Sequence, residues 1–116
     1  MNNLESYYLA LVVTQLLHSQ EEIWTRFENK WPLWKMSRKF FICFEVLFSI
    51  LIISLYLFKN FPQRELSMLI FNVLMFANGI WHLMWAGIKK QYIPGLITAP
   101  IFIIVFLKFY FNLYVK

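Results

Sequence analysis

Three ionisable side chains lie close together near the end of the first apolar stretch of this chain. Glu21 and Glu22 follow His18 by three and four residues, so in a helix all three side chains share one face. A base and two carboxylates at this spacing could chelate a metal ion or act as an acid/base cluster. The run that begins at Leu4 is apolar, and ionisable groups inside a membrane are costly and therefore functional candidates by default.

The composition predicts an all-α integral membrane protein with one domain. Of the 116 residues, 60% are hydrophobic and only 15% are charged, which leaves too little polar surface to cover the core of a soluble domain. The charged residues separate four apolar intervals, and each interval is long enough to cross about 30 Å of hydrocarbon as a helix. We therefore expect a membrane-embedded four-helix bundle within residues 1–116, with helices over about 4–24, 40–58, 65–88 and 96–114.

The net charge of +5 comes from Lys and Arg residues that flank these intervals. This placement fits topology signals and anionic headgroups better than nucleic acid, which we exclude as a partner. The segments 25–39 and 89–95 carry seven basic residues, whereas the loop between the second and third helices carries Lys59 and Arg64. The positive-inside rule then places both segments in the cytoplasm and both termini outside the cytoplasmic membrane. Cys43 is the only cysteine, which excludes an internal disulfide.

Polar side chains on other helices are predicted to lie at the depth of His18. At 1.5 Å per helical residue, four side chains fall within a slab about 3–9 Å below the inner surface. These side chains are His18, Glu45, His82 and Thr98. Gln15 shares the polar face of the first helix, and Asn78 precedes His82 by four residues, so the amide could orient the ring or share its ligand. The common depth indicates one site.

The first hypothesis is a membrane enzyme that acts on a lipophilic substrate through a bound metal. The metal ligands would be His18, Glu21, Glu22 and His82. This donor set suits iron, manganese or zinc, and bundle interiors often hold such sites. The catalytic groups would be Glu22, Glu45 and Tyr92, and the groups that contact substrate or orient ligands would be Gln15, Asn78 and Thr98. Haem bound between His18 and His82 fits less well, because Glu21 and Glu22 would lie beside the haem.

Two alternatives use the same residues differently. In a metal-free isomerase or cyclase, Glu22 or Glu45 would donate a proton and a histidine would relay it, since a carboxyl group in an apolar pocket holds its proton to a higher pH. In a non-enzymatic carrier, the polar groups would bind an ion, a proton or a small molecule. A structural role, in which His and Glu only pair to hold helices together, is the remaining explanation. The sequence leaves the substrate, the metal and the oligomeric state open.

Three motifs occur in an order that resembles a known family. They are His18-x-x-Glu21-Glu22, the run Asn78-Gly79-Ile80-Trp81-His82, and Tyr92-x-Pro94-Gly95. The set resembles the HXXEE-domain family of small bacterial integral membrane proteins. The resemblance implies that these residues form one functional unit, and it implies no activity. Glu45 lies outside the three motifs, so its place in the site rests on depth alone.

Overall fold

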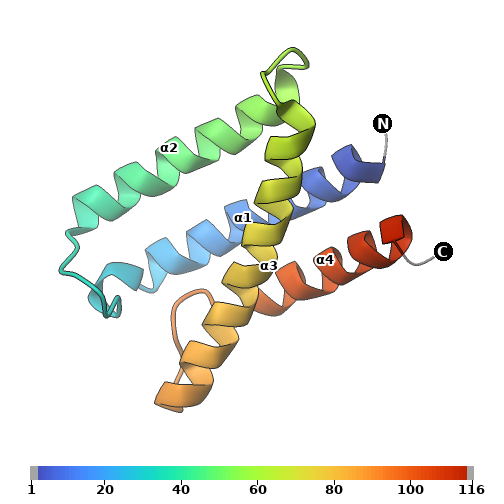
Figure 1. Ribbon diagram of the computed structural model, residues 1–116. Helices are drawn as coiled ribbons and strands as arrows, with labels where there is room; N and C mark the ends of the chain where they lie inside the picture. Colours follow the sequence, from blue (N-terminus) through green and yellow to red (C-terminus); the bar gives the residue numbers. More distant parts are fainter. Residues whose placement is uncertain (1–2, 115–116) are drawn as a thin grey trace.

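The computed structural model describes residues 3–114, and over this range the prediction of an all-helical chain with four helices is confirmed. The elements are α1 (Asn3–Trp24), the short 3-10 helix η1 (Phe27–Asn29), α2 (Arg38–Leu57), α3 (Arg64–Lys89) and α4 (Ala99–Tyr114). The start of α1 and the end of α4 lie at the same end of the molecule (Figure 1), where the Asn112 amide donates to the Tyr7 hydroxyl. From their shared loop, α2 and α3 diverge (Figure 1).

The helix ends follow local signals in the sequence. The Ser37 hydroxyl accepts a hydrogen bond from Phe40 N–H at 3.1 Å and thereby caps the start of α2. The observed bounds of α1, α2 and α3 lie within two residues of those expected. In contrast, α4 begins at Ala99 rather than near residue 96, because residues 94–98 form a turn that begins with Pro94 and Gly95.

Charged side chains hold the loop between α2 and α3 against α1. The Arg64 guanidinium donates to the carbonyl oxygens of Leu55 and Tyr56 at 2.8 Å each, which satisfies groups left free at the end of α2. Lys59 donates to the Glu5 carboxylate at 2.9 Å. This end of the fold is about 20 Å along α1 from His18, so α2 and α3 are fixed together far from the candidate site.

The core lies between the buried faces of all four helices. Tyr8 on α1 is fully buried, and its hydroxyl donates to the Ile52 carbonyl at 2.6 Å. The Tyr8 ring packs edge-on against Phe71 of α3, at a centroid distance of 5.1 Å. Phe102 brings α4 into the same group of buried apolar side chains. These contacts set the spacing of α1, α3 and α4, which carry the histidines and the turn beside them.

Two helices, α2 and α3, are long and apolar enough to cross a membrane by length and composition. Much of their apolar surface faces outward, as shown by Leu47 and Leu57, whose exposed fractions are 67% and 62%. Large apolar side chains that cover a continuous outer surface are unusual for a soluble monomer and typical of an interaction surface. α4 is also apolar and has 16 residues.

Helices α3 and α4 approach each other closely at Gly79. A Cβ atom at this position would lie 2.7 Å from the carbonyl oxygen of Ala99 and 3.1 Å from Phe102 Cβ. We expect Gly79→Ala to lower the free energy of unfolding by about 1–3 kcal/mol, because the backbone of α4 must move away. Denaturant unfolding in detergent would measure the effect.

The matched control is Gly87→Ala on the same helix, where a Cβ would meet no atom of the described residues within 4 Å. Alanine favours a helix over glycine, so this variant should gain up to about 1 kcal/mol. Equal losses in both variants would contradict a close approach at Gly79.

Candidate functional site

His18 of α1 and His82 of α3 meet in the interior of the fold. Both side chains are buried, and their rings pack edge to face with centroids 4.6 Å apart. The Nε2 atom of each ring lies 3.5 Å from the same oxygen, Oε2 of Glu22. The side chain of Glu22 is buried as well, so three potential metal ligands converge where water is largely excluded.

The geometry of this triad, His18, Glu22 and His82, fits one metal ion. Its three ligand atoms lie within 4.8 Å of one another. Nitrogen and oxygen ligands placed 2.0–2.2 Å from a tetrahedral ion are about 3.3–3.6 Å apart, and both Nε2–Oε2 distances in the triad, 3.5 Å, fall in that range. Two imidazoles with one carboxylate form a donor set that iron, manganese and zinc accept. These three side chains could therefore bind one such ion together.

The hydrogen bonds at Nδ1 of His18 determine which of its two ring nitrogens has a lone pair available for a metal ion. The Thr98 hydroxyl lies 2.6 Å from His18 Nδ1 and donates to Oε1 of Glu21 at 2.8 Å. Because a carboxylate can only accept, the hydroxyl proton points to Glu21, and the hydroxyl oxygen accepts from Nδ1–H. This arrangement leaves a lone pair on Nε2, which faces the triad, and a ligand histidine held through its other nitrogen is the usual pattern in metal sites. The Asn78 amide nitrogen is 3.4 Å from the same Nε2.

The Glu21 carboxylate lies outside the triad and faces the start of α4. It accepts from the backbone N–H groups of Ile97 and Thr98, each at 3.0 Å, and from the Tyr92 hydroxyl. The free N–H groups before α4 are thus satisfied by a side chain from α1. Side chains three and four residues beyond His18 diverge on the helix, so Glu22 turns to the histidines while Glu21 turns to the 94–98 turn. Glu21, which the sequence grouped with the metal ligands, therefore does not face the triad.

Tyr92 contacts Glu21 rather than the triad. Its side chain is 40% exposed and does not belong to the cavity described below. Partial burial and the hydrogen bond to the Glu21 carboxylate raise the pKa of the Tyr92 hydroxyl above its usual value. The hydroxyl therefore stays protonated at neutral pH and donates to Glu21, which is a positioning role.

Gly95 closes the site on the side of the turn. Its φ of 96° is one that residues with a side chain rarely adopt. A Cβ there would lie 2.5 Å from Cε1 of His18 and 2.6 Å from Cε1 of His82. Sequence reasoning did not predict this contact, because only the folded chain brings the turn against both rings.

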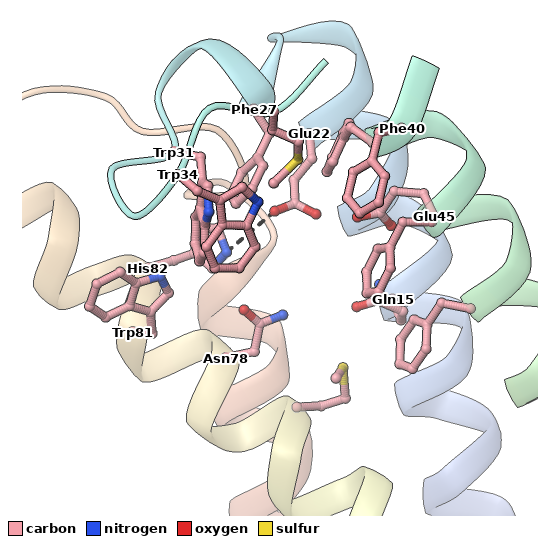
Figure 2. Close-up of a pocket in the computed structure, with 15 residues that line it drawn as sticks. Gln15, Glu22, Phe27, Trp31, Trp34, Phe40, Glu45, Asn78, Trp81 and His82 are labelled. Atoms are coloured by element: carbon pink, nitrogen blue, oxygen red, sulfur yellow. Dashed lines mark ion pairs between the residues drawn. The ribbon is translucent and has the colours of Figure 1, made fainter. Parts of the chain in front are cut away.

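An apolar cavity of about 420 Å³ adjoins the triad between α1, α2 and α3 (Figure 2). Glu22 and His82 reach it from one end, while Gln15 of α1 and Asn78 of α3 lie on opposite walls (Figure 2). The remaining wall is mostly aromatic or apolar, and includes Phe27, Trp31, Trp34, Met36, Phe40, Phe41, Phe44, Phe48, Met75 and Trp81. Its volume is within the usual range of small-molecule sites, about 300–1,000 Å³.

Glu45 reaches the same cavity from α2. Its carboxyl group is buried and interacts with the carboxyl group of Glu22, which lines the same cavity. The depth argument thus identified a neighbour of the triad that the three motifs do not include.

The aromatic lining of the cavity was missed by sequence reasoning. The signal that could have shown it is the four-residue spacing of Phe40, Phe44 and Phe48 on α2. At that spacing one face of a helix is aromatic along three turns. Trp31 and Trp34 carry no such pattern, because they lie in the irregular segment before α2.

A protein family matches most of the chain. A family described as "Protein of unknown function with HXXEE motif" matches residues 9–110, which include every side chain of the triad. No curated protein and no solved structure matches the chain.

Proposed function

Because this chain belongs to the HXXEE family, and because two residues of that motif meet a second histidine beside an apolar cavity, we propose a metal-dependent membrane enzyme. In this proposal, the triad of His18, Glu22 and His82 holds one divalent iron, manganese or zinc ion. A lipophilic substrate occupies the adjoining cavity. The observation that carries the proposal is the convergence of both Nε2 atoms on one Glu22 oxygen at the end of that cavity.

The membrane part of the proposal rests on the outer surface and on charge placement. α2 and α3 pass the length and hydropathy criteria for a membrane span. The basic residues of segments 25–39 and 89–95 lie at the end of the fold that holds the triad, and we propose that this end faces the cytoplasm with both termini on the other side.

The residues around the triad have separable tasks in this enzyme. A metal ion bound there would act as a Lewis acid or activate a bound water. The Glu21–Thr98 pair keeps His18 in the tautomer whose Nε2 can coordinate. Glu45 holds the second carboxyl group of the site next to Glu22 and can take up or release a proton during the reaction. The aromatic wall excludes water and binds the apolar part of the substrate.

The test is the metal content of the detergent-purified protein by elemental analysis. We expect about one transition-metal ion per chain in the native protein and less than about a tenth of that in His18→Ala, His82→Ala and Glu22→Gln, because two remaining ligands bind a metal weakly. Glu65→Gln, at an exposed position of α3, is the matched control and should keep the ion. An absence of metal from the native protein after gentle purification and reloading would refute the metal centre.

The two buried carboxyl groups that line the cavity, those of Glu22 and Glu45, support a second candidate, the metal-free acid/base enzyme. Two buried carboxyl groups in contact favour a state in which one of them keeps its proton. That proton could be delivered to a double bond of an apolar substrate, with His82 accepting a proton elsewhere. This candidate would replace the first if no metal binds and Glu45→Gln nevertheless abolishes turnover of an identified substrate.

A further inference from the structure

A second apolar hollow lies next to the cavity, between α2, α3 and the loop that joins them. Its volume is about 330 Å³, and its wall is formed by side chains of both helices and by Phe61 of the loop. Among the residues that the structure describes, Ser67 is the one polar side chain on this wall. The second hollow therefore suits an apolar ligand, or the apolar part of a larger one.

The cavity and the second hollow lie end to end along the same faces of α2 and α3. Phe48 lines both of them, and on α3 the second hollow extends to Leu74 while the cavity begins at Met75, the next residue. Lining residues recur every three or four positions over residues 40–55 and 67–82, which keeps them on one face of each helix. The two hollows together are named the α2–α3 groove, and its length is about 22 Å at 1.5 Å per helical residue.

The Phe48 side chain lies where the two hollows meet. It is partly buried and packs against the core, with its ring centroid 6.1 Å from that of the buried Phe71. A ring that rests on the core and lines both hollows is a shared floor, over which a flexible chain can continue from one hollow into the other.

The α2–α3 groove has one polar end. Within residues 3–114, the ionisable side chains on its wall are Glu22, Glu45 and His82, and all three line the cavity. Beyond Phe48 the wall is apolar up to Ser67, at the opposite end. A ligand that fills the groove therefore has one reactive or polar end beside the triad, and the rest of it is apolar.

The dimensions of the groove favour a single alkyl or acyl chain. An extended chain of carbon–carbon single bonds advances about 1.2 Å per bond, so about 16–18 carbon atoms span roughly 18–20 Å, close to the length of the groove. A helix of a second protein chain is 10–12 Å across with its side chains, which is too wide to enter hollows of about 420 and 330 Å³.

The groove is open on the outer surface of the fold. Leu51 of α2 and Leu74 of α3 both line the second hollow, and their exposed fractions are 52% and 54%. Phe44 lines the cavity and is exposed to a similar extent. A lipid chain could therefore enter the groove sideways from a bilayer without passing through water.

We propose that the α2–α3 groove binds one long-chain lipid, a single alkyl or acyl chain whose reactive group lies at the triad and whose methyl end lies near Ser67. This inference rests on the proposed function for its role as a substrate site, since Glu22 and His82 line the polar end of the groove. The side chains that hold the apolar part lie outside the triad, so binding of the chain can be tested separately from metal content.

The experiment maps the bound chain by photocrosslinking to the full-length protein in nanodiscs of dimyristoyl phosphatidylcholine. The probes are two forms of hexadecanamide, one with a diazirine at carbon 3 and one with a diazirine at carbon 15, and tandem mass spectrometry identifies the labelled residues. We expect the carbon-3 probe to label mainly residues that line the cavity, and the carbon-15 probe to label mainly residues that line the second hollow.

Competition separates this site from ordinary contact with the bilayer. A tenfold excess of hexadecanamide without the diazirine should reduce the labelling to about a fifth or less, because both molecules compete for one site by mass action. Contact with bulk lipid would not be reduced in this way, since phosphatidylcholine is already present in far larger amount.

Two substitutions reduce the space in the second hollow. Ser67→Phe and Leu74→Trp each place a larger side chain on its wall, and each should lower the competable labelling by the carbon-15 probe about fivefold or more, because the space is filled. The matched controls are Ser54→Phe and Leu66→Trp, at residues that line neither hollow. Leu66 is as exposed as Leu74, with fractions of 52% and 54%. Both controls should label as the native protein does, and circular dichroism establishes that each variant is folded.

Labelling that excess hexadecanamide does not reduce would overturn this inference, and so would labelling mainly on outward side chains such as Leu47 and Leu57. A reversed order of the two probes along the groove, or native labelling in both Ser67→Phe and Leu74→Trp, would also overturn it. A dimeric mass together with the absence of label from the groove would assign the groove to a second copy of the chain instead.

The same measurements keep this inference distinct from the proposed metal enzyme. If the protein binds a metal but shows no competable labelling in the groove, only this inference fails. If competable labelling is present in protein that binds no metal after reloading, the proposed metal enzyme fails and the lipid site stands.

Discussion

Gly95→Ala is expected to abolish tight metal binding and to destabilise the fold. The new Cβ would lie 2.5 Å from His18 and 2.6 Å from His82, both at ring carbon Cε1, so neither ring can keep its position. The φ of 96° adds a backbone cost for any residue with a side chain. Strain and overpacking together should lower the free energy of unfolding by about 2–5 kcal/mol, and metal affinity should fall about 100-fold.

Two measurements test this expectation: competition for the metal with a chromogenic chelator, and denaturant unfolding in detergent. Gly87→Ala is again the control, because a Cβ there would meet no described atom within 4 Å. A Gly95→Ala protein with native metal affinity would show that the turn does not pack against the histidines.

Glu21→Gln is expected to have the second largest effect. The carboxylate accepts four hydrogen bonds, two on each oxygen, from Tyr92, Ile97 and Thr98. In either orientation, the amide of glutamine would point its own N–H groups at a backbone N–H donor. We expect a loss of about 2–4 kcal/mol of unfolding free energy, since buried or partly buried donors lose their partner. The affinity for metal should fall about 10- to 100-fold, because His18 loses its indirect support.

Two further variants separate these two effects of Glu21. Thr98→Val removes the hydroxyl that contacts His18 Nδ1 and keeps both backbone N–H groups on Glu21. Metal affinity should therefore fall in Thr98→Val with a smaller loss of stability, about 1–2 kcal/mol. Tyr92→Phe should cost about 1 kcal/mol and leave the affinity within about threefold of native. Similar losses of affinity in Tyr92→Phe and Thr98→Val would refute the path through Thr98.

The helices were predictable because apolar intervals between charged clusters determine where a long helix can form. The start of α4 was not, since it depends on Glu21, a residue far away in the sequence whose carboxylate satisfies the N–H groups of the 94–98 turn. Helical spacing alone predicted that His18 and Glu22 lie on one face of a helix. Their similar depth in the membrane predicted that His82 lies near them. The same spacing also grouped Glu21 with them, because periodicity cannot say which neighbouring element each side chain will meet.

The cavity was beyond prediction for a related reason. Its wall combines phenylalanines of α2, whose spacing shows an aromatic face but not what that face meets, with tryptophans from the irregular segment before α2, which follow no pattern. Glu45, in contrast, could be predicted as a site residue, because an ionisable side chain within an apolar helix is unusual whichever residue it contacts.

The hydrogen bonds of His18 and Glu21 join an early segment of the chain to a segment that is synthesised much later. Thr98 is 80 residues from His18 in the sequence, and Ile97 is 76 residues from Glu21. A ribosome-bound chain that ends before the 94–98 turn thus carries His18 and Glu21 without these partners. These hydrogen bonds form only when the 94–98 turn docks, so a chain truncated before this turn leaves the Glu21 carboxylate without its backbone donors and His18 Nδ1 without its acceptor.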